Sequence, residues 1–250
     1  MEEEEEEAEP EAKPGKKKSK ACAADLASCP TNGCAKPGSA HALFNQKKRG
    51  EGVDLASAVA SKAKTITFEQ LRRLEERAEQ LLPKHKDLDD RKPLESVFGG
   101  FGEGTVVRLV GYVAPDHGKK YGGAHAGGIE SVNCRLEREE QRDVHVPLLP
   151  RADAEECEGV VVEPIPQSLA QHPSWTSAGF RKLAKAGKLV MIVGPLFWDN
   201  EHLVNEDCKH LKSGQPKRMS LWEIHPVTEV WVCDDDACSP SKKTGWTRVD

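Results

Sequence analysis

The sequence lacks any apolar run that approaches the roughly 20 residues a membrane-spanning helix needs. It also lacks the basic start and apolar stretch of a secretory signal peptide, because six glutamates follow Met1. With 8 cysteines scattered over 250 residues, it is too poor in cysteine to predict a disulfide scaffold. We therefore expect a cytoplasmic protein without a membrane segment, in which most cysteines are free thiols.

An excess of positive charge is missing as well. The formal net charge is −5, and residues 99–233 hold 15 Lys or Arg against 18 Asp or Glu, a net of −3. Proteins that bind nucleic acid through its phosphates carry a basic surface, so only a local patch could do so here. Familiar metalloenzyme spacings such as HExxH are also absent from the sequence.

The beginning of the chain is poor in large apolar side chains. Its first 20 residues are an acidic run followed by lysines, and the next part is rich in Ala, Gly and Ser. Such a composition cannot bury a core, so we predict a disordered or weakly structured arm over 1–64. We also predict that this arm is dispensable for folding. At the other end, residues 234–250 read as a polar tail.

Between the arm and the main domain, residues 65–98 are expected to form a helix and a linker. The helix is predicted over 67–82, where apolar side chains recur at helical spacing and the opposite face is charged. Thr67 and Gln70 make a capping box at its start, and Pro83 stops it.

Residues 99–233 change to short β-type runs separated by Gly, Pro and acidic clusters. We predict strands at 105–114, 129–136, 142–149, 159–165, 188–199 and 218–233, with one helix at 175–186. This order resembles the OB-fold, a small five-stranded Greek-key barrel with a helix between its third and fourth strands. Gly111 and Gly194 suit the tight bends of such a barrel. Another small β-barrel and an open α+β sheet are the alternatives.

The last predicted strand, which contains LWEIHPVTEVWVC (221–233), combines apolar and polar residues. Trp222 and Ile224 share one parity and should face the core, which leaves Glu223 and His225 on the other face. Pro226 has no N–H for the ladder, so we expect an edge or a bulge there that turns the polar pair toward a cleft.

Other segments supply similar polar side chains. The whole pool is Glu130, Asn133, Asp143, His145, Glu163, Asp199, His202, Glu223 and His225. Carboxylates together with imidazoles suit divalent-metal ligation or general acid–base catalysis. The catalytic candidates are His145, Glu163, His225, Asp143 and Glu223, and the first three of these are the candidate metal ligands. The competing interpretation is a solvated barrel face without function.

The nucleic-acid interpretation depends on a different set of residues. OB-folds often bind single strands across their second and third strands, with flanking loops as walls. The loop 114–128 offers Lys119, Lys120 and Tyr121 for phosphate contacts and stacking, and the second predicted strand adds Asn133 and Arg135.

The N-terminal cysteines give one more metal hypothesis. Cys22, Cys29, Cys34 and His41 could hold a structural zinc, although their spacing fits no strong zinc template. Free thiols are the alternative that we prefer.

The barrel region is also similar to a set of bacterial proteins of unknown function. The likeness lies in ESVNC (130–134), DVHV (143–146), VVVEPIP (160–166), FWDNEH (197–202) and WEIHPVTE (222–229). It implies no activity. Three functions therefore stay open: a binding module for single-stranded nucleic acid, a divalent-metal-dependent hydrolase, and an interaction domain without a small ligand. The oligomeric state is unknown.

Overall fold

The computed structural model describes residues 20–82, 88–116, 123–202, 204, 218–234, 238–239 and 244–250. The helices of this part are α1 (Ala40–Lys48), α2 (Phe68–Leu81) and α3 (Ser177–Lys185). Its strands are β1 (Lys64–Thr65), β2 (Val106–Val113), β3 (His125–Ala126), β4 (Val144–Leu149), β5 (Val160–Val162), β6 (Leu189–Trp198), β7 (Trp222–Ile224), β8 (Glu229–Cys233) and β9 (Trp246–Val249). None of these helices has both the length and the apolarity of a membrane span.

Five of the strands close into a barrel. β2 pairs with β4, β4 with β5, β5 with β7 and β7 with β6, and β6 pairs back to β2. The β5–β7 pair is parallel, whereas the other four pairs are antiparallel. The structure therefore confirms a mainly β protein with a closed five-stranded barrel. β1, β8 and β9 extend the sheet beyond the ring.

The strands form where the sequence places β-branched residues at the right period. Val107, Leu109 and Val113 of β2 point into the core, and the residues between them are less buried except Gly111. β6 is buried along nearly its whole length because it pairs with β2, β7 and β8. Gly194 is required in β6, since a Cβ there would lie 2.4 Å from the backbone oxygen of Pro226.

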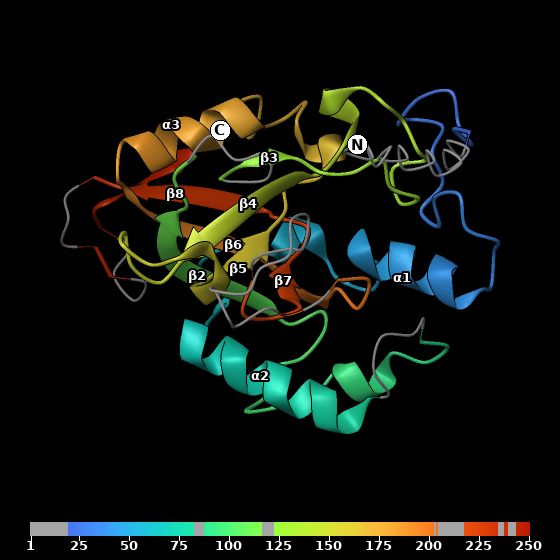
Figure 1. The fold of residues 1–250 in the computed structure, drawn as a ribbon, viewed down its shortest axis with the longest axis horizontal. Coiled ribbons are helices and arrows are strands. Elements are labelled where there is room, and N and C mark those ends of the chain that lie inside the picture. The colour runs from blue at the N-terminus through green and yellow to red at the C-terminus, as the bar shows by residue number, and fades with distance from the viewer. Residues whose placement is uncertain are drawn as a thin grey trace, which may run out of the picture.

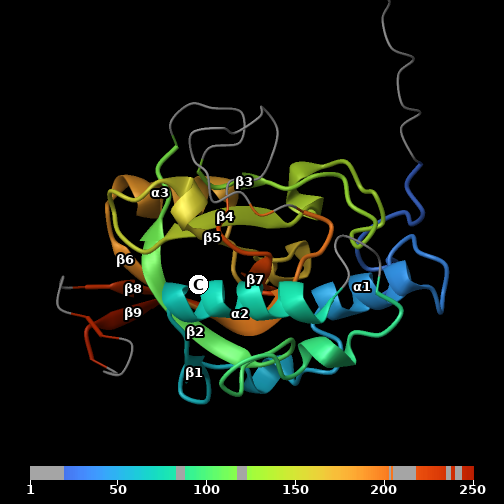
Figure 2. The same cartoon turned by 60° about the horizontal axis from the view of Figure 1, so that its bottom comes forward.

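Two helices cover opposite sides of the barrel (Figure 1). α2 begins with the predicted capping box of Thr67 and Gln70 and buries Leu71 and Leu74 against the barrel. α3 lies between β5 and β6 in the chain and buries Phe180. The turned view in Figure 2 shows α2 and α1 near the end of the barrel where β7 lies. The helices predicted over 67–82 and 175–186 are therefore both present.

The strand predicted over 129–136 is wrong. Residues 131–135 form turns instead. Cys134 and Arg135 have φ values of 53° and 56°, a left-handed backbone that interrupts a strand. The turn is held by a disulfide from Cys134 to Cys29 and by a hydrogen bond from Cys34 N to Ser131 O. These partners are distant in sequence, so the local pattern did not reveal them.

The single strand predicted over 218–233 is also wrong, because it is two short strands. β7 pairs with β6 and β5, β8 pairs with β6 and β9, and the cis His225–Pro226 bond lies between them. Pro226 thus marks an interruption of the strand rather than a bulge within it.

The arm is more ordered than the sequence indicates. α1 begins after Ser39, whose side chain accepts a hydrogen bond from Ala42 N, and it buries Phe44 and Lys48. The expectation of weak structure is therefore corrected for residues 20–64, whereas residues 1–19 lie outside the described part.

The polar-tail prediction fails in part as well. β9 pairs with β8, and Trp175 donates a hydrogen bond from Nε1 to Val249 O. Trp246 is buried. Trp246 and Val249, which flank two polar residues, therefore place β9 at the edge of the sheet.

The free-thiol expectation is wrong too. Disulfides join Cys22 to Cys34, Cys29 to Cys134 and Cys233 to Cys238, and Cys157 is also disulfide-bonded. No cysteine in the described part of the chain is a free thiol. Cys22, Cys29 and Cys34 are thus joined in disulfides, and His41 pairs with Glu201. The sulfur atoms of Cys22 and Cys34 gather with that of Cys134, so the predicted zinc set with Cys29 and His41 is not the one that the fold brings together.

Candidate metal centre

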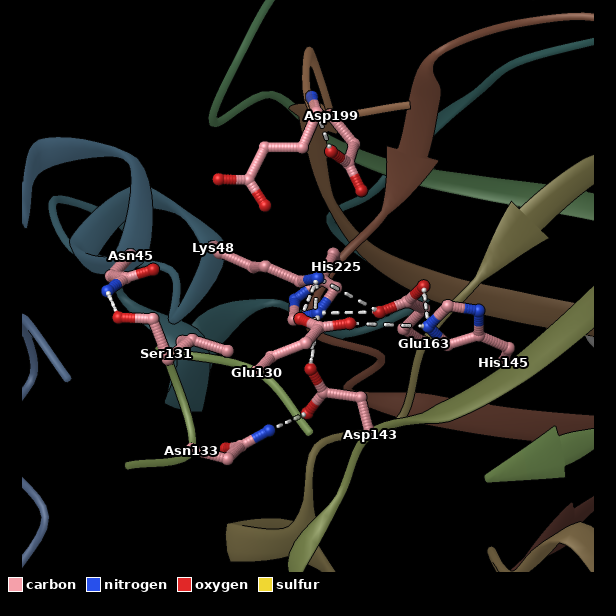
Figure 3. Close-up of polar contacts among 12 residues, drawn as sticks. Asn45, Lys48, Glu130, Ser131, Asn133, Asp143, His145, Glu163, Asp199 and His225 are labelled. Atoms are coloured by element: carbon pink, nitrogen blue, oxygen red, sulfur yellow. Dashed lines mark hydrogen bonds and ion pairs between the residues drawn. The ribbon is translucent and has the colours of Figure 1, made fainter. Parts of the chain in front are cut away.

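A cluster of buried charged side chains fills one end of the barrel (Figure 3). Asp143 and His145 come from the start of β4, Glu163 follows β5, and His225 follows β7. The start of β4, the end of β5 and the end of β7 meet at one end of the sheet, because β4 is antiparallel to β5 and β5 is parallel to β7. Strand topology therefore brings together residues that are far apart in sequence.

Glu163 lies at the middle of this cluster. Its Oε1 is 3.0 Å from His145 Nε2, and its Oε2 is 3.1 Å from His225 Nε2. His225 Nε2 is also 3.5 Å from Asp143 Oδ2. One ligand atom each from Asp143, Glu163 and His225 lie within 4.8 Å of one another. Two carboxylates and an imidazole at this separation can coordinate one divalent cation.

Two further charges complete the cluster from outside the barrel strands. Lys48, at the end of α1, places Nζ 2.7 Å from Glu130 Oε2 and 3.6 Å from Glu163 Oε2. Glu130 lies between β3 and β4, directly before the turn 131–135, and its Oε1 is 3.8 Å from His145 Nε2. α1 and this turn therefore cover the barrel end.

The atoms of the triad are buried but poorly satisfied. Asp143 Oδ2, both carboxylate oxygens of Glu163 and both ring nitrogens of His225 make no hydrogen bond of acceptable geometry within the described part of the chain. Only Asp143 Oδ1 is fixed, by the Asn133 amide at 3.0 Å. Buried polar atoms almost always have partners, so this group of atoms requires an explanation. Coordination of a cation provides one.

The charges of the cluster balance. Burial opposes ionisation of both histidines, but Glu163 and Glu130 raise the pKa of His145 to about 10, and Asp143 and Glu163 raise that of His225 to about 9. Burial would likewise lower the pKa of Lys48, yet the surrounding carboxylates hold it well above its ordinary value. Three cations thus face three carboxylates. A divalent cation that displaces one proton from each histidine leaves this balance unchanged.

The cluster is accessible from its edge. The side chains of Glu130 and His145 are 23% and 13% exposed, whereas those of Asp143, Glu163 and His225 are at most 1% exposed. From another direction, a cleft of about 510 Å³ lined by Gly50–Asp54 and Pro195 reaches His225. Glu130 and His145 are therefore the members of the cluster that face solvent.

The candidate catalytic residues, which we expected on a solvated face of the barrel, do come together, but they are buried. Glu163, Glu223 and His225 are each 0% exposed, whereas the sequence placed the last two on an open face. Glu223 and His225 lie on the other parity from Trp222 and Ile224, as predicted. α1 and the turn near Glu130 cover the face that they occupy, and the strand's own sequence does not indicate this cover.

Asp199, His202 and Glu223 form a second group near the first. One ligand atom from each lies within 4.8 Å of the others. The rings of His145 and His202 are 6.4 Å apart between centroids, so the two groups are neighbours.

Of the residues suggested for nucleic-acid binding, Lys119, Lys120 and Tyr121 lie outside the described residues. Asn133 is 2% exposed and its amide bonds to Asp143, so it is not available to a ligand in solvent. Arg135 is half-buried in the turn.

Two charged members of the site were missed by the sequence interpretation. Lys48 lies in α1, whose apolar pattern is weak, although Ser39 and Gly50 are possible start and stop signals for a helix. Arg218 is fully buried beside Glu223 and had no pattern that distinguished it from other basic residues.

Comparisons with known proteins found no matching family model, no matching curated sequence and no matching solved structure. The resemblance to bacterial proteins of unknown function therefore gains no support from them. The site has to be interpreted from its own chemistry.

Proposed function

We propose that the barrel holds a divalent cation between Asp143, Glu163 and His225 and acts as a metal-dependent hydrolase. The observation that supports this most is the meeting of three buried ligand atoms within 4.8 Å of one another. Asp143 Oδ2, Glu163 and His225 contact one another as ion pairs at 3.1–3.5 Å but make no hydrogen bond of acceptable geometry among the described residues. A site of two carboxylates and one imidazole suits Mn²⁺, Fe²⁺ or Zn²⁺.

The groups around Asp143, Glu163 and His225 suit metal-dependent hydrolysis. A cation bound there would act as a Lewis acid and lower the pKa of a bound water. Three protein ligands leave coordination positions for water and substrate. His145 and Glu130 line the accessible edge, with His145 Nε2 3.0 Å from Glu163, so they are the candidates to accept the proton of the attacking water.

Lys48 has a separate role in this proposal. Its Nζ is 2.7 Å from Glu130 and 3.9 Å from Asp143, so it contacts both the accessible edge and a ligand of the triad. A fixed ammonium in a water-poor site stabilises negative charge that develops on a substrate oxygen. The same charge also limits repulsion among the carboxylates.

We also infer that the barrel is OB-like. The ring order β2-β4-β5-β7-β6, the parallel β5–β7 pair and α3 between β5 and β6 are the features that support this. Binding of single-stranded nucleic acid stays a prediction, because Lys119, Lys120 and Tyr121 lie outside the described residues and Asn133 is buried.

The disulfides bear on the compartment. Cytosolic thiols are kept reduced, whereas disulfides persist in oxidising compartments. With Cys22–Cys34, Cys29–Cys134 and Cys233–Cys238 bridged, we propose an oxidising compartment in place of the cytoplasmic expectation.

The first prediction tests the hydrolase. Full-length protein stripped with a chelator should gain activity on a chromogenic phosphodiester, phosphomonoester or carboxylic ester only when Mn²⁺ or Zn²⁺ is restored. Asp143→Asn and Glu163→Gln should each reduce this metal-dependent rate by roughly 100-fold or more, because they lose a direct ligand and loss of an outer partner alone typically costs about 10–100-fold.

Asp153→Asn is the matched control, since the Asp153 side chain is 86% exposed and lies outside the cluster. It should keep the wild-type rate and metal requirement. The proposal is wrong if no substrate class gives a metal-dependent rate, or if Asp143→Asn and Asp153→Asn behave alike.

A further inference from the structure

The group formed by Asp199, His202 and Glu223 has the composition of a cation site in its own right. Asp199 directly follows β6 and Glu223 is the middle residue of β7. Asp199 N donates to Leu221 O, which fixes the end of β6 beside the start of β7. Asp199 and Glu223 are each 0% exposed. Burial of a carboxylate is costly unless the charge has a partner, so two buried carboxylates side by side require counter-charges.

Existing partners account for only part of this group. Arg218 Nη1 contacts Glu223 Oε1, but the other oxygen of Glu223, Oε2, is buried and makes no hydrogen bond in the described part of the chain. Asp199 Oδ2 is 2.7 Å from His202 Nδ1. Within the described residues, Glu223 therefore keeps one buried oxygen without a hydrogen bond, in a group in which one ligand atom each of Asp199, His202 and Glu223 lie within 4.8 Å of one another.

The two groups are neighbours in the chain. Glu223 is the middle residue of β7, and His225 directly follows that strand, two residues further on. Glu223 belongs to the second group and His225 to the first. Across the site, the ring of His202 approaches the ring of His145 in an edge-to-face arrangement.

We propose that Asp199, His202 and Glu223 bind a second divalent cation beside the first, so that the barrel holds a two-cation centre. This inference rests on the proposed function for the neighbouring site, but its own ligands are separate residues. Two carboxylates with one imidazole again favour Mn²⁺, Fe²⁺ or Zn²⁺ over Ca²⁺ and Mg²⁺.

The second group faces solvent through one member. The side chain of His202 is 27% exposed, whereas that of Asp199 is 0% exposed. Arg218 stays beside Glu223 and holds this ligand in place, in the way that outer partners orient metal-binding carboxylates.

The test is a comparison of Mn²⁺ uptake among variants of the full chain. Protein stripped with a chelator is titrated with Mn²⁺ in millimolar Mg²⁺, and bound Mn²⁺ is measured by electron paramagnetic resonance. The readout is the difference between each variant and the wild type, because the six glutamates after Met1 can also hold divalent ions.

His202→Ala is the main variant, since a partly exposed side chain can be removed with little effect on folding. Glu223→Gln is the second variant, with circular dichroism to verify its fold. His172→Ala is the matched control, because it removes an imidazole that stacks on Trp175 outside both groups. Asp143→Asn reports on the first position.

We expect His202→Ala and Asp143→Asn each to bind one Mn²⁺ fewer than the wild type, while His172→Ala binds the same number. Loss of one equivalent in Asp143→Asn but none in His202→Ala would overturn the second position and leave the first intact. If neither variant loses Mn²⁺, both proposals are wrong.

Discussion

At the scale of single residues, Glu75 shows how burial changes an ordinary carboxylate. It lies on α2, is 4% exposed, and its Oε2 accepts hydrogen bonds from Leu221 N at 2.7 Å and Ser220 Oγ at 3.0 Å. Burial raises its pKa to about 7, and the hydrogen bonds from Leu221 and Ser220 only partly oppose this. The residue therefore ties α2 to the segment that enters β7.

This raised pKa predicts a pH dependence of stability. The folded protein binds the proton more tightly than the unfolded chain does, whose Glu75 titrates near 4.5. The stabilisation is thus complete below about pH 4.5 and is lost as pH rises through 7, with a total on the order of 3 kcal/mol at about 1.4 kcal/mol per pKa unit. Glu75→Gln should remove this part of the dependence, as measured by urea unfolding from pH 4.5 to 8.

Glu76→Gln is the control, because Glu76 is the exposed neighbour on the same helix. It should follow the wild-type profile throughout. If Glu75→Gln also follows that profile, Glu75 is ionised in the folded state and the assignment is wrong.

The sequence allowed prediction of which residues form the site, but not of how deeply they are buried. Asp143, His145, Glu163 and His225 were identified because carboxylates and imidazoles are unusual within apolar strands. Their burial was not predictable, since it depends on Lys48 and α1, which come from a segment with a weak pattern.

At the scale of elements, α1 is the clearest case of a segment that acquires structure through its partners. Phe44 is 3% exposed and packs edge-to-face on Phe197 of β6, with ring centroids 5.1 Å apart. At the end of the helix, Lys48 reaches Glu130 and Glu163. The arm therefore contributes both packing and charge to the barrel end.

The prediction for truncation is now the opposite of the sequence-based one. A chain that starts at Thr65 loses α1 and the Cys29–Cys134 disulfide, and the loss of Lys48 leaves the three carboxylates of the cluster with one buried cation fewer. We expect its midpoint of thermal unfolding to fall by more than about 5 °C, which is on the order of 1 kcal/mol for a domain of this size.

A chain that starts at Lys20 separates α1 from the acidic residues before it. It should unfold close to the full-length midpoint, as followed by circular dichroism. Equal midpoints for the Thr65 and Lys20 chains would mean that α1 does not stabilise the barrel.

Local patterns predicted elements well where the elements depend on local rules. α2 has its capping box and helical spacing, and β2 has clear alternation, so both were found near their true ends. Residues 129–136 show the same alternation of apolar and polar side chains, yet they form a turn. The disulfide from Cys134 and the positive φ of Arg135 hold that turn, and both depend on tertiary contacts.

At the scale of the whole molecule, closure of the barrel is a long-range event. β2 and β6 pair from Val106↔Pro195 to Tyr112↔Leu189, across the segments that carry β4, β5 and α3. The element order predicted a small barrel, but no local signal specifies this pairing. Closure is what brings the ends of β4, β5 and β7 together and so creates the cluster.

One covalent link has a comparable reach. The Cys29–Cys134 disulfide joins residues 105 apart and connects the arm to the turn that carries Glu130 and Asn133. Crosslinks that close long loops restrict the unfolded chain, with a typical effect of about 2–4 kcal/mol. The same link holds Glu130 and Asn133 near His145 and Asp143 in the folded state.

The double variant Cys29→Ser/Cys134→Ser should therefore lower the free energy of unfolding by about 2–4 kcal/mol and also weaken Mn²⁺ binding. Urea unfolding and Mn²⁺ titration measure the two effects. Cys233→Ser/Cys238→Ser is the control, because that disulfide spans only 5 residues beside β8, so it should cost less stability and leave Mn²⁺ affinity unchanged. Equal effects of the two double variants on Mn²⁺ affinity would contradict the view that the arm and its crosslink position the site.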